Sequence, residues 1–475
     1  MIRRPLALAL ALVLLPSAAS AADLLQAYDM ARLSDPQLAA AESNRLAVRE
    51  GAVQARASLL PQLDGGASFS RSRIDSDGGT RPDQVGVPIS GESESDQRSR
   101  QIGINLNQTV FDYSRITTLR SQRALSQAAD FTLDSAGDSL ITRTSAAYFS
   151  VLVAIETLAA AQAQEEALKK QFDFADKRLE VGLAPITDVY EARAQYDSAR
   201  ANTIITQNAL EDAYQALAEI TGSDVRNLRG LPEDFNPQLP TDRDVEGWVA
   251  TAVDQNPSLQ ANAFQVLSSQ EDVATARAAR LPTLGLSGSY GDGRSWGTTE
   301  TPGIPDPAQR IRDLDNESRS RSLTLQLAVP IFTGGAISSR VRQAIATRDV
   351  RQDQYEQERR ALVRNTRNAY QTLVGGISEV EARKQALFSA RSAYDASQVG
   401  LEVGTRTVLD VLNNQNTLFN AEREYALARY NFLQNRLLLE QAAGTIGVTS
   451  VQDINRLLTA DAEARLAPGS VPRQQ

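Results

Sequence analysis

The spacing of hydrophobic residues changes from a helical period to a strand period at defined points along the chain. Residues 24–59 and 245–280 show the helical period, and each segment ends at a Leu-Pro pair. Proline cannot donate the next helical hydrogen bond, so a helix is predicted to stop there. The period then becomes two, which places Leu284, Leu286 and Tyr290 on one face of a predicted strand.

The same alternation predicts four strands, grouped in the hairpins 61–111 and 282–332. We expect each strand to have about ten residues, the length that a tilted strand needs to cross a bilayer. The stretches Ser72–Arg100 and Gly291–Arg321 are rich in Gly, Ser, Asp and Arg and are predicted to be exposed loops. A soluble sandwich with one wet face would show the same alternation, but two isolated hairpins provide no second sheet.

Long helical patterns follow the hairpins, over 114–181 and 335–403, and shorter ones follow these, over 185–222 and 406–444. At ~1.5 Å per residue the long segments span roughly 100 Å and the short ones roughly 54 Å. Small residues dominate, which favours the wall of a hollow helical barrel over a solid bundle. The residues predicted to pack on the helix stripes include Tyr148, Leu152, Ile155, Leu210, Tyr214, Leu217, Tyr430, Leu433 and Leu437.

The order of these patterns occurs twice, and the residues themselves repeat. The segment "SDPQL", which begins at Ser34, aligns with "QNPSL", which begins at Gln255, at an offset of 221. The segment "EVGLAPITDV", which begins at Glu180, aligns with "EVGTRTVLDV", which begins at Glu402, at an offset of 222. An offset maintained to within one residue predicts an internal twofold repeat.

Four regions follow from this pattern. Residues 1–22 combine two arginines, an apolar run and small residues, which is typical of a cleavable signal peptide. The first repeat is predicted to cover 23–241, including a Pro-rich connector, and the second to cover 242–450. Residues 451–475 are expected to form a mobile C-terminal tail.

The composition of the chain excludes most common enzyme mechanisms. The chain contains no histidine and no cysteine, which excludes imidazole-based triads and thiolate or His metal sites. We therefore predict no enzymatic activity, no cofactor and no metal site. A glycosidase with two carboxylates is the remaining enzymatic alternative, but no acidic pair accompanies an aromatic-rich cleft. A net charge of -9 without a basic stripe argues against a nucleic-acid partner.

Four strands cannot close a barrel alone, because single-chain barrels begin at eight strands. An open edge in lipid would leave backbone groups unpaired at several kcal/mol each. The fold class predicted is therefore a mixed α/β membrane protein, in which several chains share one transmembrane β-barrel that is continued by a long α-helical barrel with coiled-coil helices.

The segments "ARLSDPQL", "LLPQL", "GLAPITDVYEARAQYD" and "VGTRTVLDVLNNQNTLFNAE" resemble the TolC family of outer-membrane export channels, over about residues 23–450. The resemblance implies a homotrimer with a barrel of twelve strands, four from each protomer, in the outer membrane of a Gram-negative bacterium, and a helical tunnel in the periplasm. It also implies passive efflux of drugs and solutes and type I protein secretion, together with a periplasmic adaptor and an inner-membrane pump of the RND, ABC or MFS type.

The resemblance assigns roles to residues near the two turns between long and short helices. A gate is expected at Thr187, Asp188 and Arg406, although Leu401 replaces the family's tyrosine partner. Asp410 is expected to form an acidic ring in the pore that could bind cations. Asn413 occupies the second ring position. The tips expected to dock the adaptor are Val181, Gly182, Leu183, Val403, Gly404 and Thr405.

Other interpretations remain open at this point. The two glycines could be ordinary helix C-caps, and the polar residues could be ordinary first-turn residues. Arg406 and Asp410 could form a solvated surface pair. The whole chain could also be an exported structural protein with a coiled-coil stalk and no channel.

Overall fold

The computed structural model describes residues 23–77, 81–82, 88–89, 93–183, 185–240, 243–301 and 310–466. The predicted signal peptide and the final residues 467–475 lie outside this part of the chain. The chain divides into two compact units. The sheet unit contains Leu46–Ala128 and Ala263–Asp353, and the helical unit contains the described parts of Met1–Arg45, Ala129–Asn262 and Gln354–Gln475.

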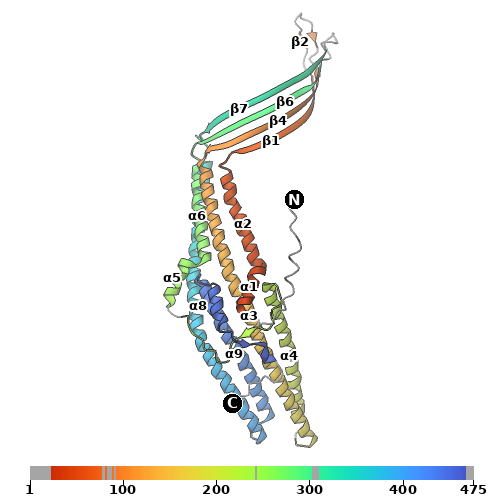
Figure 1. The fold of residues 1–475 in the computed structure, drawn as a ribbon, viewed down its shortest axis with the longest axis vertical. Helices are drawn as coiled ribbons and strands as arrows, with labels where there is room; N and C mark the ends of the chain where they lie inside the picture. Colours follow the sequence, from red (N-terminus) through yellow and green to blue (C-terminus); the bar gives the residue numbers. More distant parts are fainter. Residues whose placement is uncertain are drawn as a thin grey trace, which may run out of the picture. The chain divides into compact units, whose positions relative to one another are not determined.

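The sheet unit is built on one antiparallel sheet of four strands (Figure 1). In spatial order these are β1 (Gln62–Ser76), β4 (Ser93–Phe111), β6 (Thr283–Glu300) and β7 (Ile311–Ala328). Two short strands, β2 (Arg81–Pro82) and β3 (Pro88–Ile89), pair with each other. β7 ends just before Val329 and Pro330, as expected because proline cannot donate to the ladder.

The predicted strand length was wrong. The four main strands contain 15, 19, 18 and 18 residues rather than about ten. They extend into both segments predicted to be loops, 72–100 and 291–321, of which 78–80, 83–87, 90–92 and 302–309 lie outside the described residues. Alternation of apolar residues stops in these segments, but pairing continues between polar side chains, such as those of Arg294 and Asp315, whose nitrogen and oxygen lie 2.9 Å apart.

The register gives the sheet two chemically different faces. Leu63, Leu106 and Leu286 lie on one face, which we call the leucine face. Leu63 pairs with Leu106, Leu106 pairs with Gly288, which is two residues from Leu286, and Leu286 pairs with Leu325. Ser70 pairs with Ser99 and Ser289 with Ser322 on the opposite face, which we call the serine face. The hydroxyls of these two pairs lie 2.7 and 2.8 Å apart.

Each predicted helix before a hairpin is two helices. α1 (Leu24–Ser34) and α2 (Pro36–Ala57) precede β1, and α5 (Val245–Gln255) and α6 (Pro257–Ala278) precede β6. The residues between them, Asp35 and Asn256, are extended, with ψ angles of 118° and 119°. Each of them precedes a proline, which disfavours helical geometry in the preceding residue, so the unbroken helices predicted over 24–59 and 245–280 were wrong.

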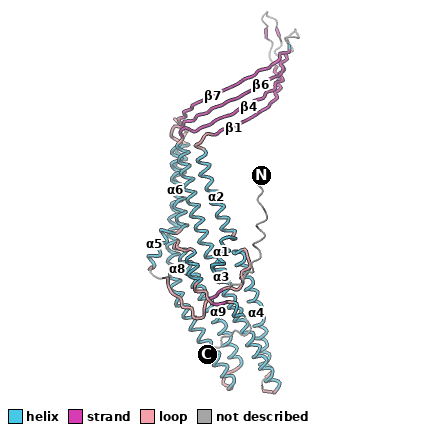
Figure 2. Tube along the Cα trace, in the orientation of Figure 1, coloured by secondary structure: helices cyan, strands magenta, loops and turns pink. Residues whose placement is uncertain are grey.

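The helical unit contains the longest elements (Figure 2). α3 (Tyr113–Glu180) and α8 (Ala336–Glu402) continue into it from the sheet unit, and α4 (Ile186–Thr221) and α9 (Val408–Ala442) follow them in sequence. Among the described residues, α3 alone is long and apolar enough by composition to cross a membrane, but half of its most apolar window is buried within the protein. That burial is what a core helix shows.

The core of the helical unit contains all the stripe residues predicted on α3, α4 and α9, among them Tyr148, Leu217 and Leu433. The C-terminal segment packs against this core, so the mobile tail predicted from residue 451 was wrong as far as residue 466. α10 (Val448–Asn455) buries Val451 and Ile454, and β8 (Ala460–Asp461) pairs with β5 (Arg229–Gly230). A 3₁₀ turn, η1 (Glu463–Leu466), follows.

Candidate functional site: two helix turns at one end of the helical unit

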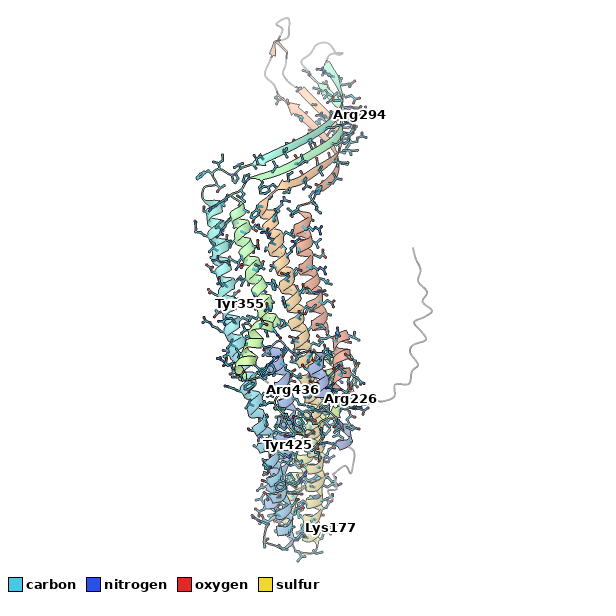
Figure 3. The ribbon with its side chains drawn as sticks, turned by 60° about the vertical axis from the view of Figure 1, so that its left-hand side comes forward. Lys177, Arg226, Arg294, Tyr355, Tyr425 and Arg436 are labelled. Carbon is cyan, nitrogen blue, oxygen red and sulfur yellow. The ribbon has the colours of Figure 1, made fainter. Side chains whose placement is uncertain are left out.

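The two turns that the sequence singles out connect α3 to α4 and α8 to α9, and both lie at the lower end of the helical unit in Figures 1 and 2. Lys177, labelled in Figure 3, lies in the last turn of α3. Its carbonyl oxygen accepts a hydrogen bond from the N–H of Val181 at 3.3 Å. The exposed apolar residues of the first turn begin at Val181.

The two turns have the same backbone geometry. Gly182 and Gly404 adopt positive φ angles of 71° and 76°, which residues with a Cβ rarely adopt. The next residue in each turn, Leu183 or Thr405, donates its N–H to the carbonyl five positions earlier, at 2.7 and 2.8 Å. This is the Schellman motif that ends many helices, so the C-cap interpretation holds for both glycines.

Apolar side chains project from these turns into solvent. Val181, Leu183 and Val403 are 69%, 68% and 69% exposed. Exposure of this degree at two turns at the same end of the unit is unusual for valine and leucine and is typical of a surface that contacts a partner. Three of the six predicted docking residues therefore present apolar area, and Gly182, Gly404 and Thr405 provide the backbone geometry.

Asp410 caps the helix that begins after the second turn. Its Oδ2 accepts hydrogen bonds from the N–H and the hydroxyl of Thr407, at 2.9 and 2.8 Å. The N–H of Asp410 in turn donates to the Thr407 hydroxyl at 3.2 Å, which completes a capping box. The hydrogen bonds from Thr407 and the charge of Arg406 hold the pKa of Asp410 below its usual value.

Thr187 and Asp188 lie in the first turn of α4, where Pro185 is the N-cap and supplies no side-chain hydrogen bond. The Thr187 hydroxyl is 3.5 Å from Asp188 Oδ1, at the limit of a hydrogen bond. Among the described residues, neither Asp188 nor Arg406 has an oppositely charged partner within 4.0 Å. Arg406 and Asp410, both of them described, form no ion pair with each other within 4.0 Å, so the alternative interpretation of a surface ion pair is not supported.

The two remaining predicted positions, Asn413 and Leu401, make ordinary helix contacts. Asn413 is exposed, and its carbonyl accepts a hydrogen bond from Thr417 at 3.0 Å. Leu401 is half-buried, and its carbonyl accepts a bond from Gly404 at 3.2 Å. Arg406 thus lies in the second turn and Asp410 at the start of α9, while Thr187 and Asp188 lie at the start of α4.

Sequence reasoning missed a buried ionic network in the helical unit. Arg429 on α9 is 2% exposed and binds both carboxylate oxygens of Glu156 on α3, at 2.7 and 2.8 Å. Tyr430 donates to the same carboxylate at 3.1 Å, and Arg465 approaches it at 3.7 Å. A buried arginine at a core position is invisible to a search for apolar stripes, and the sequence contains no signal that pairs it with Glu156.

The structure and the comparisons define the class of the protein as an outer-membrane channel. The family model described as "Outer membrane efflux protein" matches residues 27–223 and 248–445, which is most of the chain. The chain belongs to this family and is a TolC-type efflux and secretion channel of the outer membrane of a Gram-negative bacterium.

Individual relatives agree with this assignment. The chain is 36% identical to the outer membrane protein TolC of Escherichia coli (strain K12), over 96% of this chain and 89% of the relative. It is 27% identical to the alkaline protease secretion protein AprF of Pseudomonas aeruginosa, over 92% and 87%. The CmeC outer membrane channel of Campylobacter jejuni shares the fold, with a TM-score of 0.72 at 19% identity over 92% of this chain and 90% of that chain.

Proposed function

We propose that three copies of the chain form one gated export duct, with a twelve-stranded barrel in the outer membrane continued by a helical tunnel. The observation that carries the proposal is the sheet. In the described chain β1 and β7 pair on one side only, and the leucine face, with Leu63, Leu323 and Leu325 more than half exposed, has nothing covering it. Strands from neighbouring copies would pair with both edges and close the barrel.

The dimensions of the leucine face suit a bilayer. Its apolar positions on β4 run from Ile102 to Phe111, about 30 Å along the strand at ~3.3 Å per residue. At a tilt of ~40° this gives a height of about 23 Å, close to the apolar band of ~25 Å in outer-membrane barrels. The serine face would then line the channel mostly with uncharged side chains, and Asp64 and Arg312 are its charged residues on the described strands.

The twofold repeat explains how three chains surround one opening. Each half of the chain has the same order of elements: two helices, two long strands, a long helix and a shorter helix. The family model also matches each half separately. We infer that each half contributes its own turn to the periplasmic end, so that a trimer places six turns around the entrance.

The gate is proposed to lie between unlike turns. Thr187 and Asp188 belong to the first turn and Arg406 to the second, and the two charged residues have no ionic partner in the described protomer. An Arg406–Asp188 contact between neighbouring turns would hold the entrance closed. Because both residues are solvent-accessible, the contact would be weak enough, at roughly 1 kcal/mol or less, for a partner protein to break.

Asp410 is proposed to form a ring of three carboxylates in the closed entrance. Its Oδ2 is bound by Thr407, which fixes the side chain and leaves Oδ1 without a hydrogen bond among the described residues. Like charges arranged in a ring favour cations. Because Asn413 occupies the second ring position, we expect multivalent cations to block this channel less strongly than one with two acidic rings.

The exposed tips are proposed to dock a periplasmic adaptor, through which the duct joins an inner-membrane pump of the RND, ABC or MFS class. The names of the relatives, which include a protease secretion protein and a pyoverdine export protein, support both efflux and protein secretion. The proposal requires no cofactor, because the pump supplies the energy and no bond of the cargo changes.

A disulfide between the two turns tests the gate. Because the chain contains no native cysteine, the introduced cysteines can pair only with each other. We expect trimers carrying both Asp188→Cys and Arg406→Cys to form linked protomers on oxidation, to lose conductance, and to regain it on reduction. Asp188→Cys alone is the matched control and should remain unlinked. If the double variant conducts equally in both redox states, these two residues do not form the gate.

A further inference from the structure

The half of the leucine face that lies far from the helices carries mostly arginines and carboxylates where the near half carries apolar residues. Six of them form what we call the arginine belt: Arg71, Arg98, Arg100, Arg294, Arg319 and Arg321. Arg294 is labelled in Figure 3, in the part of the sheet remote from the helices. On β1, β4 and β7 the belt begins directly after the apolar positions, since Arg71 is two residues from Phe69 and Arg321 is two residues from Leu323, whereas on β6 Asp292 precedes Arg294.

The register brings like charges together in the belt. Arg71 is the direct partner of Arg98, and Arg100 is the direct partner of Arg294. Directly opposed like charges destabilise an antiparallel pair. Arg98 and Arg100 also lie next to each other on the same face of β4, so four guanidinium groups share one small area.

Carboxylates on the sheet compensate only part of this charge. Arg71 pairs with Asp96 at 2.5 Å, and Arg319 pairs with Asp292 at 3.2 Å. Asp315 and Glu317 both approach Arg294, at 2.9 and 3.8 Å. Arg100 reaches Asp292 only at 3.9 Å.

Two members of the belt have no carboxylate within 4.0 Å among the described residues. These are Arg98 and Arg321, and both are exposed. The guanidinium of Arg321 lies 5.5 Å from the centre of the Tyr290 ring, which positions it without neutralising it. Arg98 and Arg321 therefore carry positive charge outside any ion pair of the described residues, close to the boundary with the apolar part of the face.

The serine face carries much less charge, with Asp64 and Arg312 as its charged residues on the described strands. The residues that alternate with the belt arginines on the same strands, such as Ser99, Ser295 and Ser320, are uncharged. A sheet that needed charge only for solubility would carry it on both faces. Aromatic residues accompany the belt, with the Phe69 and Trp296 rings 6.0 Å apart, as at the membrane interface of barrel proteins.

We propose that the arginine belt binds the phosphate groups of anionic lipids in the outer leaflet. The proposal rests on the proposed function, because it requires the leucine face to contact lipid. Guanidinium groups bind phosphate in a bidentate manner, and a row of them just beyond an apolar band lies where phosphorylated headgroups would be. Bound phosphates would also relieve the repulsion between the directly opposed arginines.

The test uses full-length trimers in detergent, titrated with diphosphorylated lipid A and followed by native mass spectrometry. The variant Arg98→Ser/Arg321→Ser removes the two arginines without breaking an ion pair. We expect it to bind lipid A at least about tenfold more weakly than the wild type, from about 1 kcal/mol per arginine near a charged lipid surface. Zwitterionic phosphatidylcholine should bind equally to both proteins.

The matched control is Arg312→Ser, because Arg312 lies on β7 but on the serine face, opposite Thr299. It should bind lipid A like the wild type. Equal binding by the double variant and the wild type, or an equal loss in the control, overturns the proposal. If the double variant does not trimerise, the single variants Arg98→Gln and Arg321→Gln are compared in the same way.

Conductance of the same preparations in planar bilayers separates this proposal from the proposed function. Conducting trimers whose lipid binding is insensitive to Arg98 and Arg321 refute the belt alone. Wild-type trimers that never conduct refute the duct, whatever lipid they bind.

Discussion

The side chain of Arg406 lies directly against Gly400, in the last turns of α8. A Cβ atom at Gly400 would lie 2.7 Å from Cγ and 3.2 Å from Cβ of Arg406. The N–H of Arg406 also donates to the carbonyl of Gly400 at 3.1 Å. Position 400 must therefore remain without a side chain for the proposed gate arginine to keep its place. The corresponding residue before the first turn, 222 positions earlier, is Arg178.

Gly400→Ala is expected to displace Arg406 and to weaken the closed state. The two nearest atoms belong to the root of the side chain, so the arginine cannot escape by changing only its outer torsions. We expect the closed-state conductance of trimers to rise by about as much as we expect for Arg406→Ser. Gly375→Ala, in the same helix, is the control, because a Cβ there meets nothing within 4 Å. Unchanged conductance in Gly400→Ala would show that Arg406 does not need this position.

The glycines that end α9 and α3 should differ sharply in their tolerance of alanine. Gly444 and Gly182 have similar positive φ angles of 69° and 71°. A Cβ at Gly444 would lie 2.6 Å from the carbonyl oxygen of Gln255, whereas one at Gly182 meets nothing within 4 Å. We expect Gly182→Ala to cost about 1 kcal/mol from strain alone, and Gly444→Ala to cost several-fold more. Thermal unfolding of both variants, compared with the wild type, measures the difference. Equal shifts would contradict the close approach at Gln255.

Asp35 combines a helix cap with a buried ion pair. Its Oδ2 accepts the N–H of Leu38 at 2.8 Å and binds Arg143 at 2.8 Å, while Asp35 itself is 4% exposed. Burial raises the pKa of Asp35, but the hydrogen bonds from Arg143 and from the backbone outweigh it and keep the pKa below its usual value. Asp35→Ala is therefore expected to cost about 3 kcal/mol, because it leaves Arg143 unpaired and α2 uncapped.

Asp35→Asn is the matched comparison, because the second half of the chain has Asn256 at this position, where its Oδ1 accepts Leu259 N–H at 3.1 Å. Asparagine should retain the cap and lose only the ion pair, which gives a smaller loss of stability in urea unfolding. The Asp35 contribution is present above the unfolded pKa and disappears as the pH falls through the lowered folded pKa. If Asp35→Asn lowers the stability as much as Asp35→Ala does, the helix cap contributes nothing to the stability.

Asp138 provides a pH-dependent effect of opposite sign. Burial, with the charge of Asp134 as a second cause, raises the pKa of Asp138 to about 6. Above this pH the native state holds an ion in a half-buried position, so its charge lowers stability. As the pH falls below this value the native carboxyl becomes protonated and the cost decreases, until it is lost near the unfolded pKa of about 4. We expect Asp138→Asn to raise the melting temperature by a few degrees at pH 8 and to leave it unchanged near pH 4. An increase of the same size at both pH values would show that ionisation is not the cause.

The sequence predicted the helices and the faces of the sheet better than the ends of its elements. Tyr148, Leu217 and Leu433 were identifiable because a buried stripe needs only the helical period. The strand ends were not identifiable, because the residues beyond Phe69 and before Leu323 are mostly polar or charged, so the strands continue there without an apolar alternation. Periodicity reports burial, and these residues are paired without being buried.

The candidate site shows the same limit. Gly182 and Gly404 could be predicted, because a repeated glycine after a long helix indicates a C-cap. The role of Gly400 could not, because it depends on where the side chain of Arg406 folds back. α10 was missed although Val451, Ile454 and Leu458 have helical spacing, since the polar and small residues that follow them suggested a mobile end.

The most direct test of the central claim is the conductance of purified, detergent-extracted trimers in a planar bilayer. The account predicts discrete channels that are mostly closed in the wild type, with a several-fold larger conductance in Arg406→Ser, in which the proposed contact between unlike turns is absent. The absence of any discrete channel from the wild-type and Arg406→Ser trimers would contradict the duct, and identical conductance in the two would contradict the gate.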